Sequence, residues 1–147
     1  MIHHRDTEVQ SKLLHEKLTE GIIGAAIEVH RTLGAGPLES AYEECVCHEL
    51  HLRRMRFERQ VPLPVSYKGV QLDCGYHLDV VIEDRVILES KWAEHILPAH
   101  EAQILTYLKL TVKRVGLIIN LKCSCANAPQ NCSKGTLKGL RVSVSPW

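Results

Sequence analysis

Two short apolar runs around a polar triplet constrain this chain more than any other stretch of its sequence. Leu78–Ile82 and Val86–Leu88 are rich in β-branched residues, and the polar residues 83–85 separate them. Runs of this length around a short polar break are typical of a β-hairpin. Neither run alternates regularly between apolar and polar residues, which predicts that protein covers both faces of the hairpin.

Three ionisable residues, Asp79, Glu89 and Lys91, interrupt or follow these apolar runs. Burying a charge costs several kcal/mol unless the charge is paired or binds a metal ion. Each residue also has a structural alternative: Asp79 could close a turn, and Glu89 and Lys91 could reach water along their aliphatic stems. A divalent cation held by the two carboxylates would compensate the burial, so the pattern predicts a metal site.

The length of the hairpin loop decides whether the two acids meet. If residues 83–85 form a three-residue loop, Asp79 lies opposite Glu89, with their Cβ atoms about 5 Å apart on one face. Lys91, two residues further along the strand, points to the same side. Two carboxylates this close repel each other unless a cation lies between them. A two-residue loop would place the two acids on opposite faces instead.

The size and composition of the chain limit its fold and its partners. A length of 147 residues predicts one domain, and 45% hydrophobic with 24% charged residues is ordinary for a globular protein. A formal net charge of +1 excludes a strongly basic nucleic-acid coat protein, so any nucleic-acid contact must rest on a local patch. The chain contains neither a signal-peptide core nor an apolar run of about 18 residues, which favours a cytoplasmic protein without a membrane contact.

Hydrophobic periodicity and turn residues predict the order of the elements. Helices are expected over about 9–33, 38–52 and 98–110, and strands over 57–67, 70–74, the 76–92 hairpin, 115–120 and 140–144. Pro62 and Pro64 indicate an edge position for the first strand. Residues 1–8 and about 122–136 are expected to be poorly ordered or loop-like. This order predicts an α+β fold, a central mixed sheet flanked by helices.

Two motifs resemble those of known families. Asp79, followed about ten residues later by Glu89-x-Lys91, resembles the signature of the PD-(D/E)XK nuclease superfamily. Gly36, Glu39 and Tyr42 match the G-x-x-E-x-x-Y motif of the GxxExxY protein family, and the flanking helices are also similar. The resemblance covers roughly residues 8–121. It implies an α-β-β-β-α-β, restriction-endonuclease-like core.

The resemblance also implies roles for residues around the acids. Asp79 and Glu89 would hold one or two Mg²⁺ or Mn²⁺ ions, because oxygen ligands select hard cations. The Ser90 carbonyl is a further candidate ligand, and Glu39 would complete the shell directly or through water. Lys91 would orient or help to deprotonate the attacking water. The structural alternative for Glu39 is an acid placed in the first turn of a helix by the helix dipole.

Candidate substrate-binding residues come from two helices. Gln103 and Tyr107 resemble the Q-x-x-x-Y motif of one nuclease branch, whose residues border the site and touch the nucleic-acid strand. The alternative is a polar stripe on a surface helix. Tyr42 could bond a group of the site or simply pack in the core.

Two further groups of residues have weaker claims to function. Arg53, Arg54, Arg56 and Arg59 could contact phosphates, but arginines near a helix C-terminus explain the cluster as well. Cys123, Cys125 and Cys132 lack a fourth ligand and a C-x-x-C spacing. We therefore expect free thiols rather than a metal site there.

The sequence thus predicts a metal-dependent nuclease that hydrolyses phosphodiester bonds in DNA or RNA, with DNA expected ahead of RNA. The alternative is a catalytically idle module of the nuclease fold that binds nucleic acid or a protein partner. The oligomeric state stays open, with a homodimer as one option.

Overall fold

The computed structural model describes the backbone of residues 4–34, 38–122 and 140–144, and the side chains of residues 15–34 and 38–122. The elements are α1 (His4–Leu33), α2 (Glu39–Leu52), β1 (Phe57–Tyr67), β2 (Val70–Ile82), β3 (Val86–Lys91), α3 (Pro98–Thr111), β4 (Val115–Asn120) and β5 (Leu140–Val144). The predicted elements are confirmed in kind and order, except that the two segments predicted over 70–82 form one strand. Helix α1 already begins at His4, so residues 4–8 are helical rather than loop-like. The loop expected over about 122–136 lies, apart from Lys122, outside the described residues.

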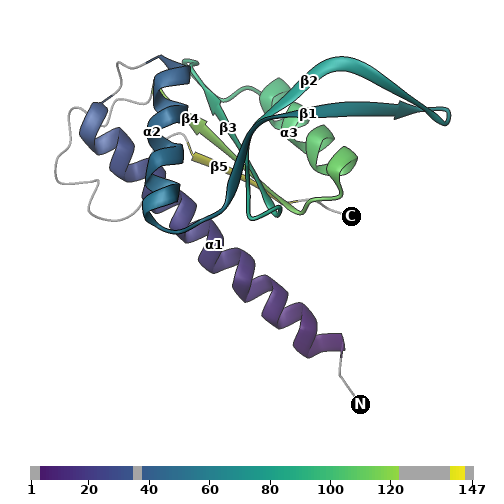
Figure 1. The fold of residues 1–147 in the computed structure, drawn as a ribbon, viewed down its shortest axis with the longest axis horizontal. Helices are drawn as coiled ribbons and strands as arrows, with labels where there is room; N and C mark the ends of the chain where they lie inside the picture. The colour runs from purple at the N-terminus through teal and green to yellow at the C-terminus, as the bar shows by residue number, and fades with distance from the viewer. Residues whose placement is uncertain (1–3, 35–37, 123–139, 145–147) are drawn as a thin grey trace.

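The five strands form one mixed sheet in the order β1-β2-β3-β4-β5 (Figure 1). Strands β3 and β4 run parallel, and the other neighbours are antiparallel. A parallel pair needs a crossover connection, which α3 supplies between β3 and β4. Strand β1 lies at the edge of the sheet, as Pro62 and Pro64 predicted, because proline cannot donate a hydrogen bond to a neighbouring strand.

Strand β2 is one continuous strand, although its sequence predicted two segments. The apparent break is a bulge, because the β1–β2 register shifts between Leu63 and Val65. The Gly75 N–H donates to Asp73 Oδ1 over 2.9 Å, and Gly75 has a φ of 72°. Glycine adopts this left-handed conformation without the steric penalty of a side chain. The Asp-Cys-Gly sequence thus bends the strand without ending it.

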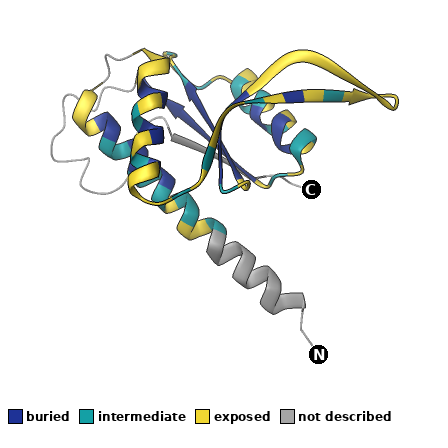
Figure 2. Cartoon of the chain, in the orientation of Figure 1, coloured by how far each residue is buried: buried dark blue, intermediate teal, exposed yellow. Residues whose placement is uncertain are grey.

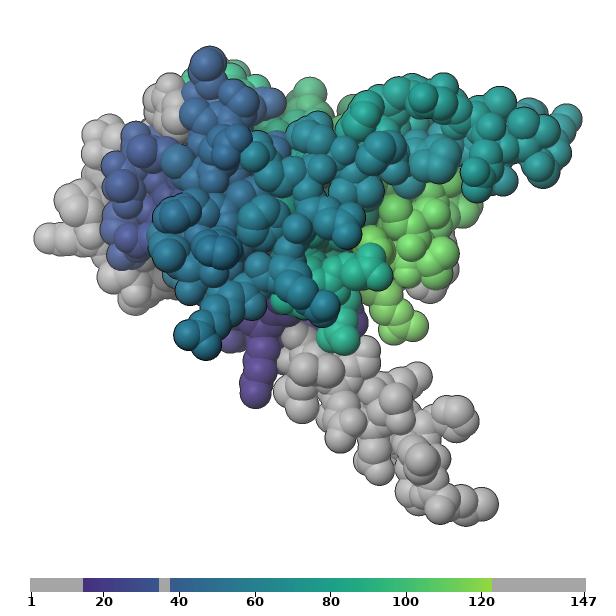
Figure 3. All heavy atoms as spheres, in the orientation of Figure 1, coloured from purple at the N-terminus to yellow at the C-terminus, as the bar shows by residue number. Residues whose placement is uncertain are grey.

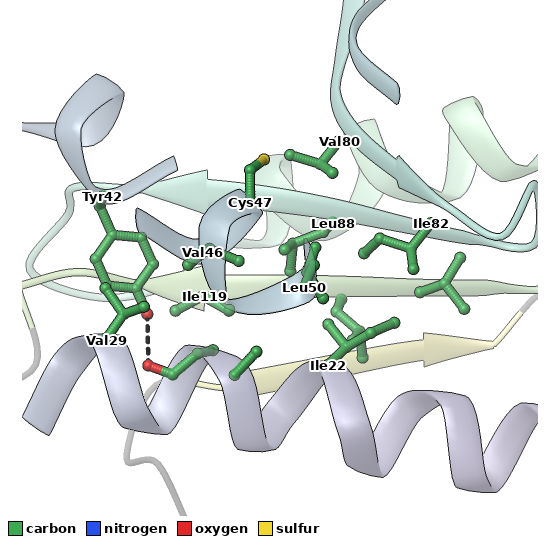
Figure 4. Packing of buried hydrophobic residues seen from close by; sticks show 14 of the residues in the cluster. Ile22, Val29, Tyr42, Val46, Cys47, Leu50, Val80, Ile82, Leu88 and Ile119 are labelled. Atoms are coloured by element: carbon green, nitrogen blue, oxygen red, sulfur yellow. Dashed lines mark hydrogen bonds between the residues drawn. The ribbon is translucent and has the colours of Figure 1, made fainter. Parts of the chain in front are cut away.

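The sheet carries helices on both faces, as the two apolar runs predicted. Helices α1 and α2 pack on one face, in a core that includes Ile22, Val46, Leu88 and Ile119 (Figure 4). Helix α3 covers the other face, where a second cluster joins residues of β1, β2, β3 and α3. In β4, a Cβ atom at Gly116 would come within 2.6 Å of Ile104 Cδ1, so this glycine lets α3 pack close to the sheet.

The β1–β2 hairpin extends beyond the helical layers. Residues 61–77, here called the β1–β2 arm, project from the body of the domain (Figures 1 and 3). Residues 66–77 of the arm are all exposed (Figure 2). The tip is the turn Lys68-Gly69, in which both residues have positive φ, as the tight turns of twisted hairpins require.

Candidate active site

The loop between β2 and β3 has the length that brings the two acids together. Ile82 pairs with Val86, so residues 83–85 form the predicted three-residue loop. The loop is held by Arg56, whose guanidinium and backbone N–H both donate to the Glu83 carboxylate. That backbone N–H is the main reason why the pKa of Glu83 lies below its usual value. These contacts fix the register of the hairpin.

Near Asp79 and Glu89, hydrogen bonds from the backbone to the two carboxylates take the place of backbone–backbone hydrogen bonds between β2 and β3. The backbone pairs of β2 and β3 extend from Ile82 only to Val80, opposite Leu88. Beyond them, the Asp79 N–H donates to Glu89 Oε1 over 3.2 Å. The Ser90 N–H in turn donates to Asp79 Oδ2 over 3.1 Å. Each carboxylate is therefore held by the backbone of the opposite strand, and the predicted meeting of the two acids is confirmed.

The environment of Glu89 makes its negative charge costly. The side chain is buried, with a relative exposure of 4%. Burial raises the pKa of Glu89 to about 8, and the charge of Asp79 and a hydrogen bond with its carboxyl group add to the rise. Lys91 acts in the opposite direction. Two acids in this position ionise together only when positive charge compensates them. Their oxygen atoms are the ligands that Mg²⁺ and Mn²⁺ prefer, so the pair fits the predicted cations.

Lys91 ends strand β3 on the side of Glu89. It pairs with Asn120 of β4, and its carbonyl accepts a hydrogen bond from the Leu121 N–H over 2.8 Å. The Asn120 side chain accepts hydrogen bonds from the backbone N–H groups of Ala93 and Lys122. These contacts fix the end of the strand. Within the described residues, the Lys91 ammonium group forms no ion pair.

Helix α3 brings its predicted pair of residues to the acids. Gln103 Nε2 donates to Tyr107 Oη over 2.7 Å. Burial raises the pKa of Tyr107, and the negative charges of Glu89 and Asp79 raise it further. Tyr107 packs in one cluster with Val81 and Ile87, which lie two residues from Asp79 and Glu89 on the same faces of their strands. The structure therefore brings Gln103 and Tyr107 together beside the carboxylate pair rather than on a solvated outer face.

No feature of the sequence predicts that Tyr76 borders the site. Its ring meets the Tyr107 ring edge-on, with 6.0 Å between the centroids and 61° between the planes. Tyr76 lies at the base of the β1–β2 arm and is 44% exposed. An aromatic residue in an apparent turn carries no distinctive signal, and the bulge that sets its position is a tertiary feature.

Glu39 and Tyr42 of the G-x-x-E-x-x-Y motif anchor helix α2. Glu39 Oε1 accepts a hydrogen bond from the Trp92 N–H over 2.7 Å, which ties the start of α2 to the end of β3. Within the described residues, no three His, Cys, Asp or Glu side chains form a cluster that could hold a metal ion. Glu39 is thus not grouped with Asp79 and Glu89, and its contribution through water stays a prediction. Gly36 lies outside the described residues.

Tyr42 is a correction to the predicted substrate-binding set. Its side chain is fully buried in the core between α1 and α2. Its hydroxyl donates to the Ala26 carbonyl over 3.0 Å (Figure 4). This is the packing role that the sequence left as the alternative, because an amphipathic pattern does not tell which buried layer a tyrosine enters. We leave Tyr42 out of the substrate-binding residues.

Most arginines of the cluster form ion pairs with glutamates of the same domain. Arg56 pairs with Glu83, Arg59 with Glu43 and Glu44, and Arg53 with Glu49. These ion pairs give Arg53, Arg56 and Arg59 a structural role, although through carboxylate partners and not through the helix dipole that the sequence suggested. Among the described cysteines, Cys45, Cys47 and Cys74 are free thiols, while Cys123, Cys125 and Cys132 lie outside the described residues.

Comparison with known protein families agrees with this geometry. A family model described as the PD-(D/E)XK nuclease superfamily matches residues 16–131. The chain belongs to the PD-(D/E)XK nuclease superfamily. The matched span is more than half of the chain and contains all the predicted site residues, and the mixed sheet between helices is consistent with this nuclease fold. Neither the curated proteins nor the solved structures gave a match. In the described part of the chain, no helix has the length and apolar character needed to cross a membrane.

Proposed function

We propose that this chain is a metal-dependent nuclease that hydrolyses phosphodiester bonds in nucleic acid, with DNA expected ahead of RNA. The observation that carries the proposal is that the carboxylates of Asp79 and Glu89 lie side by side. Each accepts a hydrogen bond from a backbone N–H of the opposite strand. Membership of the PD-(D/E)XK nuclease superfamily supports it. The more specific resemblance to the GxxExxY family stays a prediction.

Asp79 and Glu89 would hold Mg²⁺ or Mn²⁺. Two protein carboxylates suffice for such an ion, because Mg²⁺ commonly keeps several waters and shares substrate phosphates. The Ser90 carbonyl and, through water, Glu39 are the proposed further contributors. When bound, the cation would polarise the phosphate and lower the pKa of a water molecule.

The remaining side chains would bind and orient the reacting groups. Lys91, on the side of Glu89, would orient the attacking water and offset negative charge that develops on the phosphate. Tyr107 accepts the Gln103 hydrogen bond, so its own O–H is directed elsewhere and would donate to a phosphate oxygen of the strand. The protein thus supplies one cationic and one neutral donor beside two acids.

A cleavage assay tests the proposal. The full chain would be incubated with Mn²⁺ and labelled DNA or RNA, in single-stranded and duplex form. We expect cleavage by the wild type and its loss in Asp79→Asn, Glu89→Gln and Lys91→Ala. Glu58→Gln, at an exposed position of β1, is the matched control and should cleave normally. Binding without cleavage by the wild type would contradict the proposal and favour the idle module.

A further inference from the structure

Tyr76 presents a half-exposed aromatic ring on the side of the sheet that carries the two acids, where it contacts Tyr107. One ring, on Tyr107, packs in the cluster that contains Val81 and Ile87, which lie two residues from Asp79 and Glu89 on the same faces of their strands. The other ring, on Tyr76, is 44% exposed. A nucleic-acid strand whose phosphate reached the carboxylate pair would therefore have an aromatic surface within reach of its bases.

The backbone directly before Tyr76 departs from regular strand geometry. The bulge at residues 73–75 ends directly before Tyr76, and Tyr76 resumes pairing opposite Leu63. His77 Nδ1 lies 3.0 Å from the Gly75 carbonyl oxygen, which adds a second local contact to the bulge. Bulges next to active sites commonly redirect a side chain. This bulge sets the position at which the strand presents the Tyr76 ring.

The β1–β2 arm has an apolar surface without net charge. Residues 61–77 contain one lysine, Lys68, and one acid, Asp73. Tyr67, Val70 and Leu72 of the arm are exposed apolar side chains. Such a surface gains little from a phosphate backbone, whose binding depends on lysine and arginine. The exposed ring of Tyr76, at the base of the arm, is matched instead to the face of a base, which is accessible in a single strand and hidden in the stack of a duplex.

We propose that Tyr76 stacks on a base of single-stranded nucleic acid next to the carboxylate pair, so that unpaired strands are the substrate class. The inference rests on the proposed nuclease function and narrows it. Stacking on an aromatic side chain contributes about 1–3 kcal/mol per base and tolerates any sequence. This contact would therefore add to the affinity for a single strand and not for a duplex.

Binding in the absence of cleavage provides the test. The full chain with Glu89→Gln, in EDTA, would be titrated into labelled oligothymidine and into a duplex of equal length, with fluorescence anisotropy as the readout. We expect tighter binding of the single strand. Tyr76→Ala and Tyr76→Leu should raise its Kd roughly 5- to 100-fold, whereas Tyr76→Phe should stay within about twofold of the parent. The leucine variant keeps apolar bulk against Tyr107 and guards against a folding defect in the alanine variant.

Tyr67→Ala is the matched control, because Tyr67 is an exposed tyrosine at the tip of the same arm. It should leave the Kd within about twofold. Equal or tighter binding of the duplex, an unchanged Kd in Tyr76→Leu, or equal losses in the Tyr67 and Tyr76 variants would overturn the inference. A wild type that shows the Tyr76 pattern but cuts nothing would contradict the nuclease proposal and support this binding role. A wild type that cuts duplex as well as single strands would contradict only the substrate class.

Discussion

The backbone N–H of Asp79 donates a hydrogen bond to the carboxylate of Glu89 across two antiparallel strands. The Ser90 N–H returns a hydrogen bond to Asp79. The positions of both acids are thus set by strand pairing, and the pairing is set by the three-residue loop of the hairpin. A change that alters the charge of either acid without altering the loop therefore tests the chemistry of the site separately from its geometry.

Without divalent ions, Glu89 should make stability depend on pH. Its pKa in the folded protein is about 8, above the value of about 4.3 for an unperturbed glutamate. The raised pKa means that the protonated side chain favours the folded state, so this contribution is fully present below about pH 4.3 and is lost as the pH rises towards 8.

Glu89→Gln should remove that dependence. In EDTA, we expect the variant to be more stable than the wild type at pH 8 by about 1–3 kcal/mol, with a smaller difference at pH 5. Urea unfolding at both pH values measures it. If the stability of the two proteins changed with pH in the same way, the pKa of Glu89 would not be raised in the folded protein.

Lys91→Met should separate catalysis from metal binding. Removing an electrostatic stabiliser of the transition state should lower cleavage by about 100-fold or more. Mn²⁺ affinity should be unchanged or slightly higher, because a positive charge near Glu89 is removed. Lys68→Met, at the arm tip, serves as the control. If Mn²⁺ binding falls together with cleavage, Lys91 acts on the fold of the site instead.

Glu39→Gln tests the proposed contribution through water. The amide keeps an oxygen that can accept the Trp92 N–H, so stability should hardly change. Loss of the negative charge from an outer-shell partner should weaken Mn²⁺ binding by about 10-fold. Calorimetry and urea unfolding give the two quantities. Unchanged Mn²⁺ affinity would restrict Glu39 to tying α2 to β3.

Tyr42→Phe tests the correction made to the substrate-binding set. The variant loses the hydrogen bond to the Ala26 carbonyl and should be destabilised by about 0.5–1.5 kcal/mol. The Km for nucleic acid should not change, because the hydroxyl lies in the core. A variant with normal stability and a higher Km would return Tyr42 to the substrate-binding residues.

Much of the site could be predicted by counting along the chain. Strand alternation and the length of the 83–85 loop were enough to place Asp79 opposite Glu89. The edge position of β1 followed from the backbone chemistry of Pro62 and Pro64. These predictions depend on local geometry, which the sequence encodes directly.

The features that were missed depend on contacts between distant segments. The continuity of β2 was hidden because Asp73 and Gly75 are also typical turn residues, and only the register with β1 distinguishes a bulge from a turn. Whether Tyr42 faces the site or the core depends on how α2 rotates against α1. The partners of Arg56 and Arg59 likewise come from other elements.

Calorimetric titration of the apo protein with Mn²⁺ at pH 7 tests the central claim most directly. Because Glu89 is largely protonated without a cation, we expect binding to release protons, seen as a heat that changes with the ionisation enthalpy of the buffer. Asp79→Asn and Glu89→Gln should each abolish the binding, and Glu58→Gln should leave it intact. Absence of Mn²⁺ binding to the wild type, or equal binding by Glu89→Gln, would contradict a metal site built on Asp79 and Glu89.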